Sequence, residues 1–177
     1  VNLDGSATEA EAVSFPQRSY IIKSTVSIYE NFESAPKQVF YENKPVTLYS
    51  GLTINVLKDA HGIHHNQTIE DPSPPRLQTL RVTAGSIVKF SWAGLATTIK
   101  LEVRQAHRPH TIIFFDPSGN TIETKQLPYR SSGDLIPLDF EYKAPAGRYI
   151  SHFQINAAQD PGTGHLRWFY LDDLTIN

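Results

Sequence analysis

Short runs of alternating apolar and polar residues follow one another along the chain, separated by Pro, Gly, Asn and Asp. Turn signals spaced by about 8–12 residues are typical of an all-β sandwich or barrel. No window of a dozen residues carries a helical apolar stripe. The pattern predicts strands at Tyr20–Ile28, Val46–Tyr49, Leu52–Leu57, Gln78–Val82, Ser86–Trp92, Thr98–Arg104, Thr111–Phe115, Thr121–Gln126, Leu138–Tyr142, Tyr149–Asn156 and Leu166–Ile176.

The alternation assigns faces to two of these runs. Ser86–Trp92 places Val, Phe and Trp on one face and Lys and Ser on the other. Thr98–Arg104 likewise separates Ile, Leu and Val from Lys and Glu. We expect the two runs to form a half-exposed antiparallel pair connected by Ala93–Thr97, with Trp92 packed in the core.

A third run, Thr111–Phe115, is apolar on both faces and predicts a central strand that is covered on each side. It is followed by Asp116–Asn120, which has the sequence DPSGN. Pro presets φ and Gly accepts a positive φ, so this segment predicts a tight turn. The turn connects Thr111–Phe115 to Thr121–Gln126 as a hairpin.

Composition narrows the class of protein. The chain has 177 residues, a formal charge of −2 and neither cysteine nor methionine. We expect one domain over residues 20–177 after a flexible lead-in over residues 1–19. The charge argues against nucleic-acid and anionic-membrane binders, and no apolar run is long enough to span a membrane. Absent cysteine excludes disulfides and thiolate metal sites, and absent methionine indicates a piece of a longer chain.

The seven histidines raise the question of a metal site. His61 and His64 lie with His65 in a polar loop-like segment, which favours either a solvated loop or a metal or ligand site. Arg108 and His110 precede the predicted central strand, where they either flank a binding site or belong to a solvated loop.

Enzymatic motifs are weak. The segment Pro145–Asn156 is similar to the second motif of cupins, but its histidine is too far from its glycine and the first cupin motif is absent. The sequence contains no G-x-S-x-G elbow and no phosphate-binding glycine loop. A catalytic function is therefore unsupported, and a cupin-like metal-dependent enzyme remains only as a third interpretation.

Four segments in order carry a resemblance to a known group of folds: Tyr29–Pro36, Tyr49–Ile54, the FFDPSGNTI hairpin and His165–Ile176. Together they resemble galactose-binding-like jelly rolls, which include non-catalytic carbohydrate-binding modules and related domains of secreted and cell-surface bacterial proteins. The resemblance implies an antiparallel β-sandwich, a jelly roll, whose first and last strands lie side by side.

The resemblance also implies a structural calcium near the chain ends. Glu30 or Glu33 with Asp172 or Asp173 would supply its oxygen ligands. The alternative is that the Asp pair only forms hydrogen bonds near a strand end. Strand parity requires either that Asp172 is buried and satisfied, or that a bulge intervenes.

Sugar binding needs an aromatic plane flanked by polar groups. Tyr129 lies in a predicted loop with Arg130 and Asp134, and Trp168 lies in a run with aromatics on both faces. With His61, His64, Arg108 and His110, these form the predicted ligand-binding set. It would occupy a loop end or a concave face.

The sequence thus predicts a non-catalytic carbohydrate-binding module of a secreted or surface multidomain protein, with flanking domains and no organic cofactor. The alternative is a structural or protein-interaction spacer domain of an adhesin, toxin or enzyme.

Overall fold

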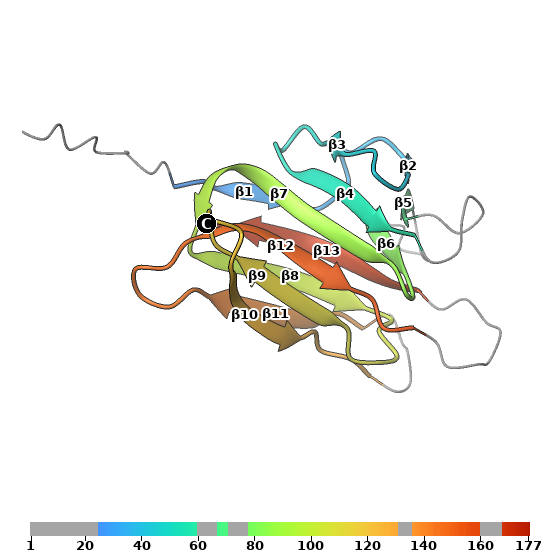
Figure 1. The fold of residues 1–177 in the computed structure, drawn as a ribbon. Coiled ribbons are helices and arrows are strands. Elements are labelled where there is room, and N and C mark those ends of the chain that lie inside the picture. The colour runs from blue at the N-terminus through green and yellow to red at the C-terminus, as the bar shows by residue number, and fades with distance from the viewer. Residues whose placement is uncertain (1–24, 60–66, 71–77, 131–135, 160–167) are drawn as a thin grey trace, which may run out of the picture.

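Two antiparallel sheets pack face to face in the computed structural model (Figure 1), which describes residues 25–59, 67–70, 78–130, 136–159 and 168–177. The first sheet runs in the order β11 (Leu138–Lys143), β8 (Thr98–Arg104), β13 (Trp168–Ile176), β6 (Thr79–Thr83), β5 (Gln67–Glu70) and β2 (Val39–Phe40), with β1 (Ile28–Glu30) also paired to β13. The second runs β10 (Thr121–Gln126), β9 (Thr111–Phe115), β12 (Ile150–Asn156), β7 (Ile87–Ala96), β4 (Thr53–Lys58) and β3 (Val46–Thr47). The predicted all-β antiparallel sandwich is confirmed.

The core is a layer of aromatic and branched side chains between the sheets. Phe90, Phe114 and Phe153 are all 0% exposed, and the Phe90 and Phe153 rings stack with centroids 4.7 Å apart. Trp92 is buried, as predicted, and packs on Phe153. Each such side chain contributes about 1.5–3 kcal/mol by leaving water.

The predicted pairing of β7 with β8 is wrong. Strand β7 pairs with β12 and β4, whereas β8 pairs with β13 and β11 in the opposite sheet. Gly94 takes a φ of 105° near the end of β7, and the chain passes to the other sheet at Thr97. Both strands have the predicted inward faces, but these faces meet across the core because alternation does not specify a neighbour.

The predicted hairpin of β9 and β10 is confirmed. Its turn is held by the Asp116 carboxylate, which accepts the backbone N–H groups of Ser118 and Asn120 at 2.9 Å each, and Gly119 has a φ of 82°. Strand β9 has neighbours on both sides, but its outer face is only half covered, since Phe115 is half-buried. The prediction that both faces of this strand are covered was therefore wrong.

Strands β1 and β13 pair antiparallel, so the first and last described strands lie side by side, as the resemblance implied. The sequence missed β2 and β5, which are two and four residues long. The predicted lead-in and the start of the predicted Tyr20–Ile28 strand lie outside the described residues. Within the described ranges, no helix is long and apolar enough to cross a membrane.

Candidate functional site: a carboxylate-lined hollow on the seven-stranded sheet

A bulge in β13 positions two consecutive carboxylates. Before it, Phe169 and Leu171 belong to the core, and after it Leu174 and Ile176 do, so the inward parity changes once. The register with β8 shifts between Asp172 and Thr175, and Asp173 has a φ of 45°, which is uncommon for a residue with a side chain. Non-glycine residues in this region tend to occur at functional sites.

Both alternatives that the sequence offered for Asp172 hold. Its side chain is buried at 3% exposure, and the bulge follows it. Its carboxylate accepts the N–H of Asp173 at 2.9 Å and lies 3.3 Å from the Arg104 guanidinium. Burial raises the pKa of Asp172 to about 6, against the opposing effect of these partners.

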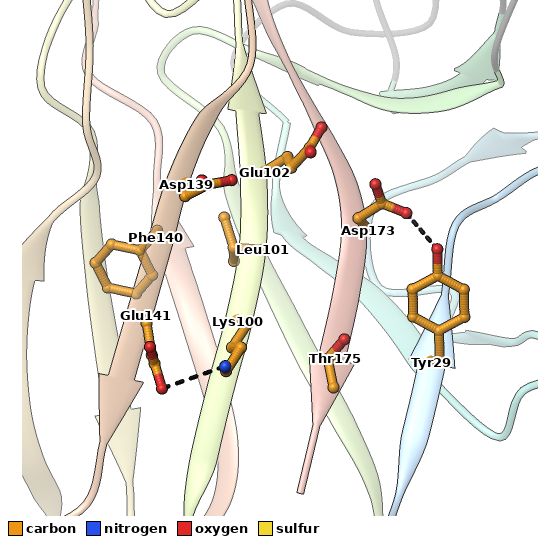
Figure 2. Close-up of a pocket in the computed structure, with 9 residues that line it drawn as sticks. All are labelled: Tyr29, Lys100, Leu101, Glu102, Asp139, Phe140, Glu141, Asp173 and Thr175. Atoms are coloured by element: carbon orange, nitrogen blue, oxygen red, sulfur yellow. Dashed lines mark hydrogen bonds and ion pairs between the residues drawn. The ribbon is translucent and has the colours of Figure 1, made fainter.

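A hollow of about 320 Å³ opens next to this bulge on the outer face of the sheet. Figure 2 shows that side chains of β1, β13, β8 and β11 surround it. It is lined by Tyr29, Lys100, Leu101, Glu102, Asp139, Phe140, Glu141, Asp173 and Thr175. We call this the sheet-face hollow.

Tyr29 forms one wall of the sheet-face hollow and is 59% exposed. Its hydroxyl donates a hydrogen bond to the Asp173 carboxylate (Figure 2). This bond, with a smaller contribution from burial, raises the pKa of Tyr29 to about 12. The phenol therefore stays neutral, and the ring is held at the rim.

Glu141 and Asp139, both on β11, form the opposite wall. The Glu141 carboxylate lies 3.3 Å from Lys143 and 3.5 Å from Lys100. The hydrogen bond from Lys143 and the charge of Lys100 lower the pKa of Glu141, so it remains ionised. Exposed pairs of this kind add little to stability, so their main effect is to orient the side chains.

Between the walls, acidic residues lie opposite one another on three neighbouring strands. Glu102 on β8 is in register with Asp139 on β11 and with Asp172 on β13. Ligand oxygens of Glu102, Asp172 and Asp173 all lie within 4.8 Å of one another. Arg104 is 2.8 Å from Glu102 and balances part of this charge. Like charges directly opposite on a sheet are destabilising, so this row is a cost to the fold.

The described members of the predicted ligand-binding set lie elsewhere. Tyr129 and Arg130 are exposed after β10, where the Arg130 N–H donates to the Ala106 carbonyl, and the Arg108 guanidinium donates to the Gln159 carbonyl. The structure thus brings Tyr129, Arg130 and Arg108 to one loop end, away from the sheet-face hollow. Trp168 is 37% exposed and its ring lies 5.5 Å from the Arg81 guanidinium.

His110 is an interior residue, 6% exposed, rather than a surface ligand. Its ring stacks on Phe169 with centroids 4.0 Å apart, and its Nδ1 accepts the N–H of Ala158 at 3.0 Å. Burial, assisted by the charge of Arg108, lowers the pKa of His110 to about 4, so the imidazole is neutral at pH 7. His61, His64 and Asp134 lie outside the described residues.

The predicted calcium residues do not all converge. Glu30 is 4% exposed, and its carboxylate accepts the Phe32 N–H and the Ser50 hydroxyl. Glu33 accepts the N–H of Gln78. In the described part of the chain, Asp172 and Asp173 form their acidic group with Glu102, not with Glu30 or Glu33. Calcium binding itself stays a prediction.

Sequence reasoning missed most of the sheet-face hollow. Alternation already placed Lys100 and Glu102 on the outer face of their strand, and this was the available signal. Tyr29 and Asp139 carried no comparable signal, because their significance depends on the order β11–β8–β13–β1.

Comparisons with known proteins give likenesses in fold. No family model matches the chain, and no curated protein matches its sequence. The K3 cleaved adhesin domain of Lys-gingipain from Porphyromonas gingivalis W83 is 15% identical over 85% of this chain and 97% of that chain, with a TM-score of 0.49. The K1 cleaved adhesin domain is 11% identical over 86% and 98%, with a TM-score of 0.48. A family 29 carbohydrate-binding module from Piromyces equi is 16% identical over 81% and 90%, with a TM-score of 0.43.

Proposed function

We propose that the chain is a non-catalytic carbohydrate-binding module and that the sheet-face hollow is its binding site. One observation carries the proposal: an exposed aromatic ring, Tyr29, lies at the rim of a hollow whose other lining side chains are mostly hydrogen-bonding groups. A concave site with a few convergent polar groups is the usual form of a small-ligand site.

The chemistry suits a sugar. The Tyr29 ring offers a flat apolar face to the C–H groups of a pyranose, and such a contact contributes about 0.5–1.5 kcal/mol. Glu102 and Asp139 offer carboxylate oxygens that accept sugar hydroxyls, and Lys100 donates. The hydrogen bond of Tyr29 to Asp173 and the ion pair of Lys100 with Glu141 hold four lining side chains in place before a ligand arrives. This order lowers the entropic cost of binding.

The same geometry favours binding over hydrolysis. A glycosidase needs a protonated carboxyl group close to the scissile oxygen and a second carboxylate across the bond. Asp172, whose pKa is raised to about 6, is 3% exposed and contacts Arg104 and the Asp173 N–H. Glu141, which lines the hollow, has a lowered pKa and stays ionised. We therefore assign binding rather than turnover to this site.

We extend the proposal to a location outside the cell or on its surface, and to flanking domains in a longer chain. Both follow from the resemblance to galactose-binding-like modules. The full-length gene product would test both.

A glycan array followed by calorimetric titration tests the proposed function. We expect the protein to retain at least one glycan, and Tyr29→Ala to weaken that binding about tenfold because stacking is lost. Tyr49→Ala is the matched control, since Tyr49 is 89% exposed in the β3–β4 turn and does not line the hollow; it should change affinity less than about twofold.

Two results would contradict this assignment. Failure of the wild-type protein to bind any glycan would favour the spacer interpretation. Loss of binding in Tyr129→Ala, with Tyr29→Ala unaffected, would move the site to the loop end predicted from the sequence.

A further inference from the structure

The lining of the sheet-face hollow is strongly acidic. It contains one cationic side chain, Lys100, and the four carboxylates of Glu102, Asp139, Glu141 and Asp173. A cavity lined mostly by one sign of charge concentrates ligands of the opposite sign and repels ligands of its own sign.

Only two of these carboxylates have cationic partners among the described residues. Glu141 lies near Lys100 and Lys143, and Glu102 lies 2.8 Å from Arg104. Asp173 accepts a hydrogen bond from the neutral Tyr29 phenol, and Asp139 has no ion pair within the described ranges.

These two carboxylates lie on either side of the central strand of the hollow. Asp139 is in register with Glu102, and Asp173 directly follows Asp172, the partner of Glu102 on the other side. Figure 2 shows Asp139, Glu102 and Asp173 at the same end of the hollow. A ligand cation at that end would offset the repulsion along the row.

The rim favours an organic ammonium group over a bare metal ion. The Tyr29 ring provides an aromatic face beside the carboxylates, which is the chemistry that attracts organic cations. The Arg104 guanidinium already lies between Glu102 and Asp172, so the three-carboxylate group next to the hollow contains a cation of its own. The remaining polar lining, including Thr175, suits a ligand that also carries hydroxyl groups.

Resting on the proposed function, we infer that the sheet-face hollow selects protonated amino sugars over neutral and acidic sugars. The ammonium group lies at the end of the hollow between Asp139 and Asp173, and the pyranose ring lies against Tyr29. Uronate and sulfated sugars are excluded by like-charge repulsion.

Calorimetric titration with three oligosaccharides of equal length tests this inference: glucosamine, N-acetylglucosamine and galacturonate hexamers, all in EDTA to remove divalent cations. Below the pKa of the amine, we expect the glucosamine hexamer to bind about tenfold more tightly than its N-acetylated form, because hydrogen bonds between charged groups are stronger. The advantage should shrink as salt is added and disappear above the amine pKa.

Two variants and a control locate the effect. Asp139→Asn and Asp173→Asn keep the side-chain shape and should each lower the ratio of the affinity for the glucosamine hexamer to the affinity for its N-acetylated form, because only the ammonium group gains from the charge that is removed. Glu123→Gln removes a carboxylate from β10 in the other sheet and should leave the advantage unchanged.

The outcomes separate the two proposals. If the glucosamine and N-acetylglucosamine hexamers bind equally, or if galacturonate binds best, the inference fails and the proposed function stands. If no sugar binds in this experiment or on the array, both fail.

Discussion

The outer faces of the two sheets differ sharply, although the same alternation builds both. The seven-stranded sheet presents the sheet-face hollow with its charged lining. On its central strands β7, β12 and β9, the six-stranded sheet presents Lys89 and neutral groups: the Gln154 side-chain amide donates to the Asn156 side-chain carbonyl oxygen at 2.6 Å, and Phe115 stacks on His152. Burial lowers the pKa of His152, which favours its neutral form.

This difference shows which positions of a sandwich are free to specify function. Inward positions on both sheets are constrained by the core and carry the same kind of side chain. Outward positions are not, so the two faces can differ: Gln154 bonds to Asn156 on the six-stranded sheet, while on the seven-stranded sheet the Asp139 carboxylate has no ion pair among the described residues. A charged group that destabilises the fold and has no ion-pair partner within it is the feature expected of a binding face.

The largest expected effect on stability comes from truncating a core side chain that packs between the two sheets. Phe153 is 0% exposed and contacts the rings of Phe90, Trp92 and Phe114. Phe153→Ala should lower the free energy of unfolding by about 3–5 kcal/mol through lost burial and a cavity. Denaturant unfolding measures the loss.

The matched control is Phe115→Ala on the outer face of the six-stranded sheet. Phe115 is half-buried and contacts His152, so its truncation should cost only about 1 kcal/mol. Equal losses in the two variants would show that the six-stranded face is itself a packed surface, and the comparison between the faces would fail.

A smaller effect distinguishes the charged face by pH. The pKa of Asp172 is about 6 in the folded protein, above its ordinary value of 3.8. As pH rises from about 4 to about 7, the unfolded chain loses this proton first, so the contribution of Asp172 to wild-type stability falls. Asp172→Asn cannot ionise, and its stability relative to wild type should rise by about 1–2 kcal/mol over that range, allowing for partial solvation.

Unfolding of both proteins across this pH range measures the difference. His110, with its lowered pKa, has the opposite effect, because its contribution is lost as pH falls below about 6.5, but it is present in both proteins and cancels. A stability difference that does not change with pH would mean that Asp172 is ionised throughout and that the acidic row is better compensated than its contacts suggest.

The sequence predicted which side chains face the core better than it predicted which strands pair with each other. Inward faces of β7 and β8 follow from the period of two, and the β9–β10 turn follows from Pro117 and Gly119, because both depend only on nearby residues. The sheet to which each strand belongs depends on contacts between distant segments. The pairing of β7 with β8 was therefore wrong despite correct faces.

The site was harder to predict for the same reason. Tyr29 and Asp173 form a hydrogen bond although 144 positions separate them. Local chemistry instead favoured the loop residues Tyr129 and Arg130 as the site, and it also favoured His110, whose burial against Phe169 no local pattern indicates. The bulge after Asp172 was the exception, since it disturbs the alternation of its own strand.

The smallest expected effect on stability is the sharpest test of the charge difference between the faces. Lys100 is the cation that lines the hollow, and its pair with Glu141 is exposed on both sides. Lys100→Ala should therefore change the free energy of unfolding by less than about 1 kcal/mol. The same change removes a positive charge from the hollow, so the glucosamine hexamer should bind about twofold to fivefold more tightly. Lys89→Ala on the other face should leave that affinity unchanged, because Lys89 lies on the opposite sheet. If Lys100→Ala weakens binding of the glucosamine hexamer instead, Lys100 donates to the bound sugar more strongly than it repels it, and hydrogen bonding rather than net charge determines what this face binds.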